Sequence, residues 1–244
     1  MVRGLQPRTR FPGSVTPNPT LHSRTNLKEP TLTLLNELIT RYPELSVVRE
    51  PTARAAEAIC RAYRAGGKVL VCGNGGSASD AEHIVGELMK SFVAKRELPE
   101  AHVEMFRQSG LPDWEDLVRN LEMAVPAIAL TGHPSLSTAI INDIDSAMVY
   151  AQQVYGYGRP EDVLIGLSTS GNARNVCNAL GVARVMGLTT IGLTGSAACQ
   201  FDDLCDILIK APERETYKVQ EHHLPIYHAI CMMVEHELFV TDVL

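Results

Sequence analysis

One stretch, residues 68–89, constrains the fold of this chain more than any other: KVLVCGNGGSASDAEHIVGELM. Its first apolar residues, 69–72, are too few for a helix and rich in β-branched side chains, a pattern typical of a buried strand. A glycine-rich turn follows at 73–76, and Ser77 to Asp80 then open an amphipathic helix with hydroxyls and an acid. A strand, a glycine turn and a helix N-terminus in this order present free backbone N–H groups and the positive end of a helix dipole to an anion.

The same stretch limits which anion it can bind. No Gly-Lys-Ser or Gly-Lys-Thr follows the turn, so the lysine that a P-loop uses for the outer phosphates of a nucleotide is missing. GNGGSA also lacks the third glycine of the dinucleotide-binding G-x-G-x-x-G pattern. A small phosphorylated ligand therefore fits better. On the same helix His83 and Glu87 are four residues apart, so both side chains lie on one face.

Composition excludes several classes of protein. With 244 residues, 45% hydrophobic and 20% charged, the chain is predicted to form one soluble α/β domain. A formal net charge of −6 argues against a nucleic-acid binder, which normally has a basic surface. No apolar run reaches the roughly 18 residues of a membrane span, and no secretory signal is expected. The six cysteines show no C-x-x-C pairing, which favours reduced thiols and a cytoplasmic location.

The first residues, 1–28, differ in composition from the rest. They are rich in Pro, Thr, Ser, Asn and Arg and lack periodic apolar residues, so we expect a disordered tail. A transit peptide is the alternative, because arginines recur and no acid precedes Glu29. The prolines of this segment disfavour the amphipathic helix that such a peptide needs. We therefore predict a tail over 1–28 and a single domain over 29–244.

Short apolar runs and helical patterns alternate along the domain. Helices are expected at 30–42 and 50–64, ahead of the strand at 69–72. Further buried strands are expected at 127–131, 163–168, 189–194 and 206–210, and helices at 135–142, 146–155, 172–186, 198–204 and 219–239. This alternation predicts an α/β fold with a five-stranded parallel sheet between two layers of helices, and ligands at the carboxyl ends of the strands.

A longer connection, about 93–125, interrupts the alternation and exceeds what a β-α unit normally needs. It contains two polar, helix-compatible pieces at 100–108 and 113–123, with the single tryptophan, Trp114. Two hypotheses are equally compatible with it. The insertion is either a surface element packing on its own or a neighbouring subunit, or a lid over the site that begins at Gly73.

A second anion-binding turn is predicted at LSTSGN, residues 167–172. It follows a strand and opens a helix, as the first turn does. The hydroxyls of Ser168, Thr169 and Ser170, together with helix N–H groups, can hold a phosphate dianion without Lys or Arg. Ordinary helix capping is the alternative. One cap needs one such side chain, and Asn172 adds a fourth polar group, so we favour phosphate.

A third cluster lies in KVQEHHLPIYH, residues 218–228. Gln220, Leu224 and His228 share one face of the predicted helix. Together with His83 and Glu87 they offer two imidazoles, a carboxylate and an amide oxygen, a set of ligands suited to Zn²⁺ or a similar ion. The alternative, that His228 is an ordinary core histidine, is about as well supported by the spacing alone.

Five ordered segments make the chain similar to the SIS (sugar isomerase) domain, and within it to the phosphoheptose isomerases. They are GNGGSASDAEHIVGEL, the Asn142-Asp143 pair, LIGLSTSGNARNV, TIGLTG and KVQEHHLPIYHAICMMVEHELF. The resemblance covers about 32–239 apart from the insertion. It implies a flavodoxin-like three-layer sandwich and the interconversion of sedoheptulose 7-phosphate with D-glycero-D-manno-heptopyranose 7-phosphate. It also implies a homotetramer with active sites between subunits.

The resemblance further implies roles for individual residues. Phosphate would be bound by Ser77, Ser168, Thr169 and Ser170. Sugar hydroxyls would be held by Asn74 and Asp143, with further substrate contacts at Gly75, Asn172 and Gln220. One metal ion, usually zinc in the family, would be held by His83, Glu87, Gln220 and His228. Of these, Glu87 and His228 would also form the acid/base pair.

Two positions depart from the family pattern. Ala173 stands where the family has a serine after STSGN, which removes one phosphate hydroxyl. Tyr217 stands where the family has an aspartate that touches the sugar. Together with the insertion, these departures suggest a branch whose substrate need not be the heptose.

Isomerisation of an aldose and a ketose moves a proton between adjacent carbons through an enediol, while a second group manages the protons of the oxygens. A carboxylate facing an imidazole supplies both roles, so Glu87 is expected as the carbon base and His228 as its partner. Two alternatives are a non-catalytic scaffold like the relative that binds the bacterial replication initiator, and a phosphosugar-sensing regulatory domain. The complete set of candidate metal ligands argues against a pure scaffold.

Overall fold

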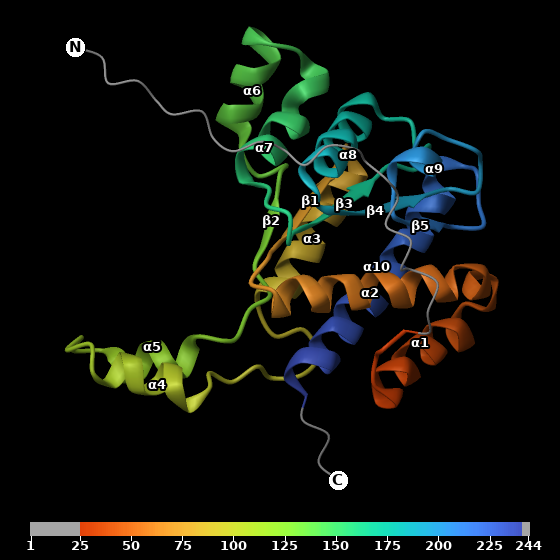
Figure 1. The fold of residues 1–244 in the computed structure, drawn as a ribbon. Helices are drawn as coiled ribbons and strands as arrows, with labels where there is room; N and C mark the ends of the chain where they lie inside the picture. The colour runs from red at the N-terminus through yellow and green to blue at the C-terminus, as the bar shows by residue number, and fades with distance from the viewer. Residues whose placement is uncertain (1–24, 241–244) are drawn as a thin grey trace, which may run out of the picture.

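The structure, a computed structural model, describes residues 25–240 (Figure 1). Its centre is a sheet of five strands in the order β2-β1-β3-β4-β5. The strands are β1 Val69–Gly73, β2 Ala127–Ala129, β3 Val163–Leu167, β4 Thr189–Thr194 and β5 Ile207–Lys210. Every neighbouring pair is parallel. The predicted parallel α/β fold is therefore confirmed, whereas the tail predicted for 1–28 lies, up to residue 24, outside the described residues.

The central strands are buried on both faces because each is a short apolar run. In β1, Val69 and Val71 pack into one core cluster, whereas Leu70 and Cys72 pack into the other. Residue alternation along a strand produces this division. The register places Gly73 at the end of β1 opposite Leu167 at the end of β3. The turns that follow these two strands consequently lie side by side.

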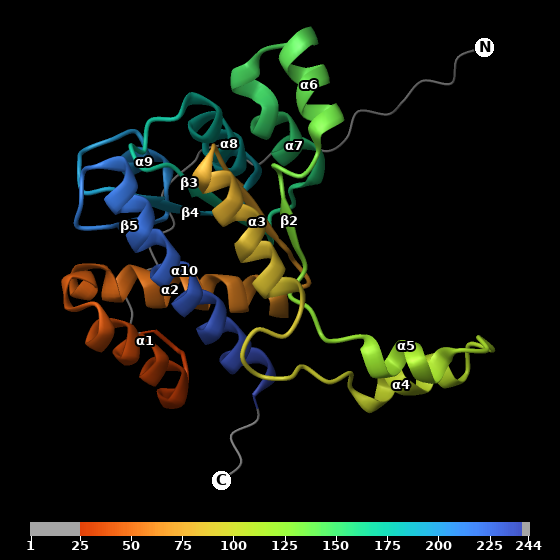
Figure 2. The same ribbon diagram turned by 180° about the vertical axis from the view of Figure 1, so that it is seen from behind.

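Helices cover both faces of the sheet (Figures 1 and 2). The first cluster includes side chains of α1 Glu29–Arg41, α2 Arg49–Arg64, α3 Gly76–Met89 and α10 Thr216–Phe239. The second includes side chains of α6 Pro134–Asp143, α7 Val149–Tyr157, α8 Arg174–Met186 and α9 Phe201–Leu204. Two 3₁₀ turns, η1 Pro43–Val48 and η2 Ser146–Met148, precede α2 and α7.

The insertion forms two short helices, α4 Glu100–Arg107 and α5 Trp114–Asn120, which pack against each other and bury none of their residues. Figures 1 and 2 show this hairpin projecting away from the body. It leaves from the end of α3, which runs back from the carboxyl edge of the sheet to the amino edge. The hairpin therefore extends away from the turn at Gly73 of the same chain, which favours the hypothesis of a surface element over that of a lid.

Two general properties follow from the described residues. Among residues 25–240, no helix is both long and apolar enough to cross a membrane. The cysteines are all unpaired, and four of them, Cys60, Cys72, Cys177 and Cys231, are buried. Burial raises the pKa of the Cys60 thiol to about 12 and that of the Cys231 thiol to about 12. These thiols are consequently inert core side chains.

Candidate functional site

The first predicted turn has the backbone shape that an anion site needs. Gly75 adopts a φ of +56°, and Ser77 is buried in the first turn of α3, where its N–H donates to the carbonyl of Asn74 at 3.0 Å. A Cβ on Gly73 would lie 2.5 Å from the carbonyl oxygen of Ser77, so only glycine fits there. The turn thus presents the N-terminus of α3 at the carboxyl edge of the sheet.

The second predicted turn, residues 168–173, lies beside it. Ser168 is buried and its Oγ lies 3.4 Å from the Oγ of Ser170, while Gly171 takes a φ of +64°. Helix α8 begins two residues later than predicted, because this turn takes up residues 168–173 before regular helix can start. Asn172 links the turn to the segment after β4. Its Nδ2 donates to the carbonyl of Ser170 at 2.9 Å, and its Oδ1 accepts from the N–H of Gln200 at 3.0 Å.

A pair of amides joins the two turns. Nδ2 of Asn74 donates to Oδ1 of Asn175 at 2.9 Å, and Nδ2 of Asn175 donates back to Oδ1 of Asn74 at 2.8 Å. The hydroxyl of Tyr150 donates to the carbonyl of Gly73 at 2.5 Å and so fixes the start of the first turn. Asn175 and Tyr150 were not predicted. The signal for Asn175 was its place in the first turn of the helix that follows STSGN.

Two further positions singled out in the sequence are Asp143 and Tyr217. Asp143 is exposed at the end of α6, and within the described chain its side chain accepts a hydrogen bond from Nδ2 of Asn142 at 2.7 Å. Helix α6 lies at the β2 edge of the sheet, on the other side of the molecule from α10 (Figures 1 and 2). Tyr217, near the start of α10, is 60% exposed. Asp145, two residues after Asp143, accepts from Nη2 of Arg174 at 3.5 Å, so the end of α6 lies near the start of α8.

Three of the predicted metal and acid/base residues, His83, Glu87 and His228, lie together between α3 and α10. Nε2 of His83 lies 3.1 Å from Oε1 of Glu87, and the rings of His83 and His228 are 5.0 Å apart. Gln220 lies about two helical turns before His228 on α10, against the start of α3. A Cβ on Gly76 would come within 1.7 Å of Nε2 of Gln220, so the glycine permits the close approach of the two helices.

Two further residues complete this cluster and were missed from the sequence. The hydroxyl of Tyr227 lies 3.0 Å from Nδ1 of His83 and donates to Oδ1 of Asp80 at 3.3 Å. Burial raises the pKa of Asp80, an effect that hydrogen bonds from Tyr227 and Gln220 oppose. Tyr227 is the neighbour of His228 in sequence and Asp80 precedes His83 by one helical turn, so their positions alone gave a weak signal.

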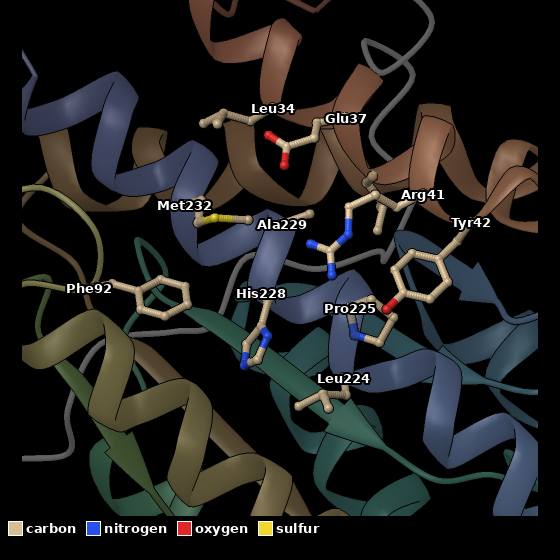
Figure 3. Close-up of a pocket in the computed structure, with 11 residues that line it drawn as sticks. Leu34, Glu37, Arg41, Tyr42, Phe92, Leu224, Pro225, His228, Ala229 and Met232 are labelled. Atoms are coloured by element: carbon tan, nitrogen blue, oxygen red, sulfur yellow. The ribbon is translucent and has the colours of Figure 1, made fainter.

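His228 lines a pocket of about 410 Å³ beside this cluster (Figure 3). The walls come from α1, α10 and the segment after α3, and the ring of Phe92 lies 5.4 Å from that of His228, tilted by 52°. Nε2 of His228 is buried without a hydrogen-bond partner in the described structure. Burial, followed by the neighbouring His83, lowers the pKa of His228, while Glu87 opposes the shift. His228 is thus a neutral imidazole at pH 7 that can accept a proton.

The fit of a metal ion can be judged from these contacts. Within residues 25–240, no three His, Cys, Asp or Glu side chains are arranged together as a finished metal site. The donor chemistry nevertheless suits zinc: two imidazoles, a carboxylate and an amide lie along the facing sides of α3 and α10. The unpartnered Nε2 of His228 is a free lone pair or N–H in a buried position. These residues therefore fit such an ion in their chemistry.

The parallel α/β fold with two serine-rich turns at the carboxyl edge of its sheet is found in a family of known proteins. Residues 46–120 and 101–195 match the family model of the SIS domain, so this chain belongs to the SIS domain family. Phosphoheptose isomerase of Rhodospirillum rubrum is 37% identical over 186 residues, which are 76% of this chain and 85% of that protein. At that identity and coverage, the chain falls within the phosphoheptose isomerase group of the family.

Solved structures agree with this placement. A phosphoheptose isomerase from Neisseria gonorrhoeae matches with a TM-score of 0.63 and 32% identity, over 84% of this chain and 98% of the other. A phosphoheptose isomerase from Francisella tularensis matches with a TM-score of 0.66 and 26% identity, over 84% and 95% of the two chains. The resemblance inferred from the sequence is therefore confirmed.

Proposed function

We propose that this chain is an aldose–ketose isomerase that interconverts sedoheptulose 7-phosphate and D-glycero-D-manno-heptose 7-phosphate. The observation that carries the proposal is the meeting of Glu87 with two histidines between α3 and α10, where His83 lies 3.1 Å from the carboxylate and 5.0 Å, ring to ring, from His228. The two serine-rich turns at the carboxyl edge of the sheet supply the phosphate-binding end. The relatives named phosphoheptose isomerase support this substrate.

The chemistry follows from the two facing groups. Glu87 removes the proton from C1 of the ketose, and the electron pair left behind forms the enediol between C1 and C2. His228, neutral at pH 7, moves the proton between the oxygens on C1 and C2. Return of the carbon-bound proton to C2 gives the aldose, so C1 is oxidised, C2 is reduced, and no external electron carrier is needed. General acid–base groups placed in this way contribute about 10²–10⁴ in rate.

The phosphate end is held by hydroxyls and helix N–H groups. Ser77 and the turn of Ser168, Thr169 and Ser170 face the same edge, and the N-termini of α3 and α8 add positive ends of helix dipoles. Contacts from Asn74, Gly75, Asn172 and Gln220 would orient the sugar. Ala173 offers one hydroxyl fewer than the family pattern, which predicts weaker phosphate binding than in relatives that keep the serine.

A divalent ion, most simply Zn²⁺, is part of the proposal. His83, Glu87, Gln220 and His228 would hold it, and its charge would stabilise the negative charge that develops on the enediol oxygens. We also propose a cytoplasmic homotetramer with sites shared between subunits. The open pocket beside His228 supports a contribution from a second subunit.

The direct test is proton exchange. Purified protein is incubated with a panel of ketose phosphates in deuterated buffer, with and without Zn²⁺, and the C1 protons are followed by NMR. Exchange with sedoheptulose 7-phosphate and formation of the aldose are expected. If no ketose phosphate exchanges a C1 proton, the isomerase proposal is wrong and a non-catalytic scaffold takes its place.

A further inference from the structure

A buried ion pair lies directly behind the candidate acid/base residues. Nε of Arg96 is 2.7 Å from Oε1 of Glu235, and the two residues are 1% and 2% exposed. Removing two charges from water is costly, so such a pair is weak evidence for stability by itself. The role of this ion pair is therefore judged from the other hydrogen bonds that Arg96 and Glu235 make.

The guanidinium of Arg96 binds the backbone of the candidate base. Nη2 donates to the carbonyl of Glu87 at 2.8 Å, and Nη1 donates to the carbonyl of Leu88 at 2.7 Å. These carbonyls belong to the last turn of α3, where helical carbonyls lack partners within the helix. Arg96 thus closes the helix at the residue that must place its carboxylate against the substrate carbon.

The carboxylate of Glu235 organises the loop that faces His228. It accepts hydrogen bonds from the backbone N–H groups of Phe92 at 2.7 Å and of Val93 and Ala94 at 2.8 Å each. The ring of Phe92 contacts that of His228, with the ring centres 5.4 Å apart. Glu235 lies seven residues after His228 on α10, so both side chains are on the same face of that helix.

The same pair anchors the projecting hairpin. The carbonyl of Arg96 accepts from the N–H of Met123 at 2.8 Å, and the carbonyl of Leu88 also accepts from the N–H of Val125 at 2.9 Å. The N–H of Arg96 donates to Oγ of Ser91 at 2.9 Å. The entry and exit of the insertion therefore meet at this ion pair.

We propose that Arg96 and Glu235 are positioning residues for catalysis: Arg96 fixes the backbone of Glu87, and Glu235 fixes Phe92 against His228. This inference builds on the proposed isomerase function. It treats the ion pair as a shared support for the base and its partner. A shift of about 1 Å in a catalytic group can cost on the order of 10² in rate. Disturbing the ion pair should therefore lower kcat more than it lowers the stability of the fold.

The test compares three variants of the full chain. Arg96→Lys keeps a cation for Glu235 but loses the fork that reaches two carbonyls at once. Glu235→Gln keeps the shape but can accept through one oxygen only, so it loses either the bonds from Phe92 and Arg96 or those from Val93 and Ala94. Lys68→Met is the matched control, because it breaks another largely buried pair: Lys68 Nζ lies 2.6 Å from Oδ2 of Asp162 at the amino edge of the sheet, away from the site.

We measure kcat and KM for sedoheptulose 7-phosphate and the urea midpoint of unfolding for each. Arg96→Lys and Glu235→Gln should lower kcat by about tenfold or more while KM changes less than about threefold, because the phosphate turns are untouched. Lys68→Met should lower the urea midpoint but leave the kcat of folded protein unchanged. If Glu235→Gln does not fold, Ser91→Ala, which removes the acceptor for the N–H of Arg96, replaces it with a smaller expected loss in the same direction.

Two results would overturn the inference alone: a folded Arg96→Lys protein with kcat within twofold of the parent, or a Lys68→Met protein that loses kcat as much as the Arg96 and Glu235 variants do. An inactive parent is a different outcome. It would refute the isomerase proposal and this inference with it, so the two failures can be told apart.

Discussion

Tyr227 holds its phenolic oxygen 3.0 Å from Nδ1 of His83 and so joins α10 to α3 at the candidate metal and acid/base site. Burial raises the pKa of Tyr227, so the phenol stays protonated and donates a hydrogen bond to Oδ1 of Asp80 at 3.3 Å. The phenolic oxygen then accepts from Nδ1–H of His83. Nε2 of His83 then has a lone pair and lies 3.1 Å from Oε1 of Glu87, which is also an acceptor. A proton or a cation between these two acceptor atoms would remove the repulsion between them.

A metal ion should satisfy this need. We expect the parent protein to bind one Zn²⁺ per chain, and His83→Asn and His228→Asn to bind it at least tenfold more weakly, because each loses an imidazole ligand. Isothermal titration calorimetry on metal-stripped protein measures this. His102→Asn, an exposed histidine of α4, is the control and should bind as the parent does. Unchanged affinity in both site variants would exclude this set of ligands.

Glu87→Gln should abolish isomerisation, because an amide cannot accept the carbon-bound proton. Removal of a general base typically lowers the rate by about 10²–10⁴. The loss should appear as slower exchange of the C1 proton in deuterated buffer, whereas binding of inorganic phosphate at the serine-rich turns should persist. A variant that exchanges the C1 proton as fast as the parent would show that another group is the base.

The second turn should hold the phosphate of the substrate. Ser168→Ala and Ser170→Ala each remove a charge-assisted hydrogen bond and should weaken binding of the phosphosugar by about 1.5–3 kcal/mol. Urea unfolding should change little. Ser109→Ala, in the connection between α4 and α5, is the control. Phosphosugar affinity equal to that of the parent in both turn variants would remove this turn from the site.

Assembly can be measured directly. We expect a homotetramer, because the family resemblance implies one and the pocket of about 410 Å³ beside His228 stays open in a single subunit. Light scattering at micromolar concentration should give a mass close to four chains. A mass of one chain would contradict both the tetramer and a site shared between subunits.

We expect His223 to make the stability of the fold depend on pH. This histidine is fully buried on α10, and burial lowers its pKa from 6.5 to about 4 in the folded protein. Because the unfolded chain takes up a proton below pH 6.5 and the folded chain does so only near pH 4, stability is complete above pH 6.5 and falls as the pH drops toward 4. Between pH 7 and pH 5 the loss from this group is about 2 kcal/mol.

His223→Leu tests this directly. The variant should lose less stability than the parent between pH 7 and pH 5, by about 2 kcal/mol in urea unfolding. His102→Asn again serves as the control and should follow the parent. An equal pH dependence of His223→Leu and parent would show that His223 does not remain neutral in the folded protein.

Most of the fold could be predicted from local sequence. Short apolar runs separated by helical patterns predicted every strand of the sheet, and the strand at 189–194 has the predicted bounds. The glycine turn after Cys72 and the hydroxyls at the start of α3 likewise predicted an anion site at the carboxyl edge. These features depend on residues close together in the chain, whose preferences act before any tertiary contact forms.

The contacts that shape the site depended on the tertiary structure. Asn175 meets Asn74 only because the register of β1 and β3 aligns the two turns. Tyr227 reaches His83, and Arg96 reaches Glu235 across 139 residues, only because α10 lies along α3 with a particular face turned toward it. Periodicity determined which residues share a face of each helix. The rotation and position of one helix against another depend on the packing of the whole core, and that packing decided which faces meet.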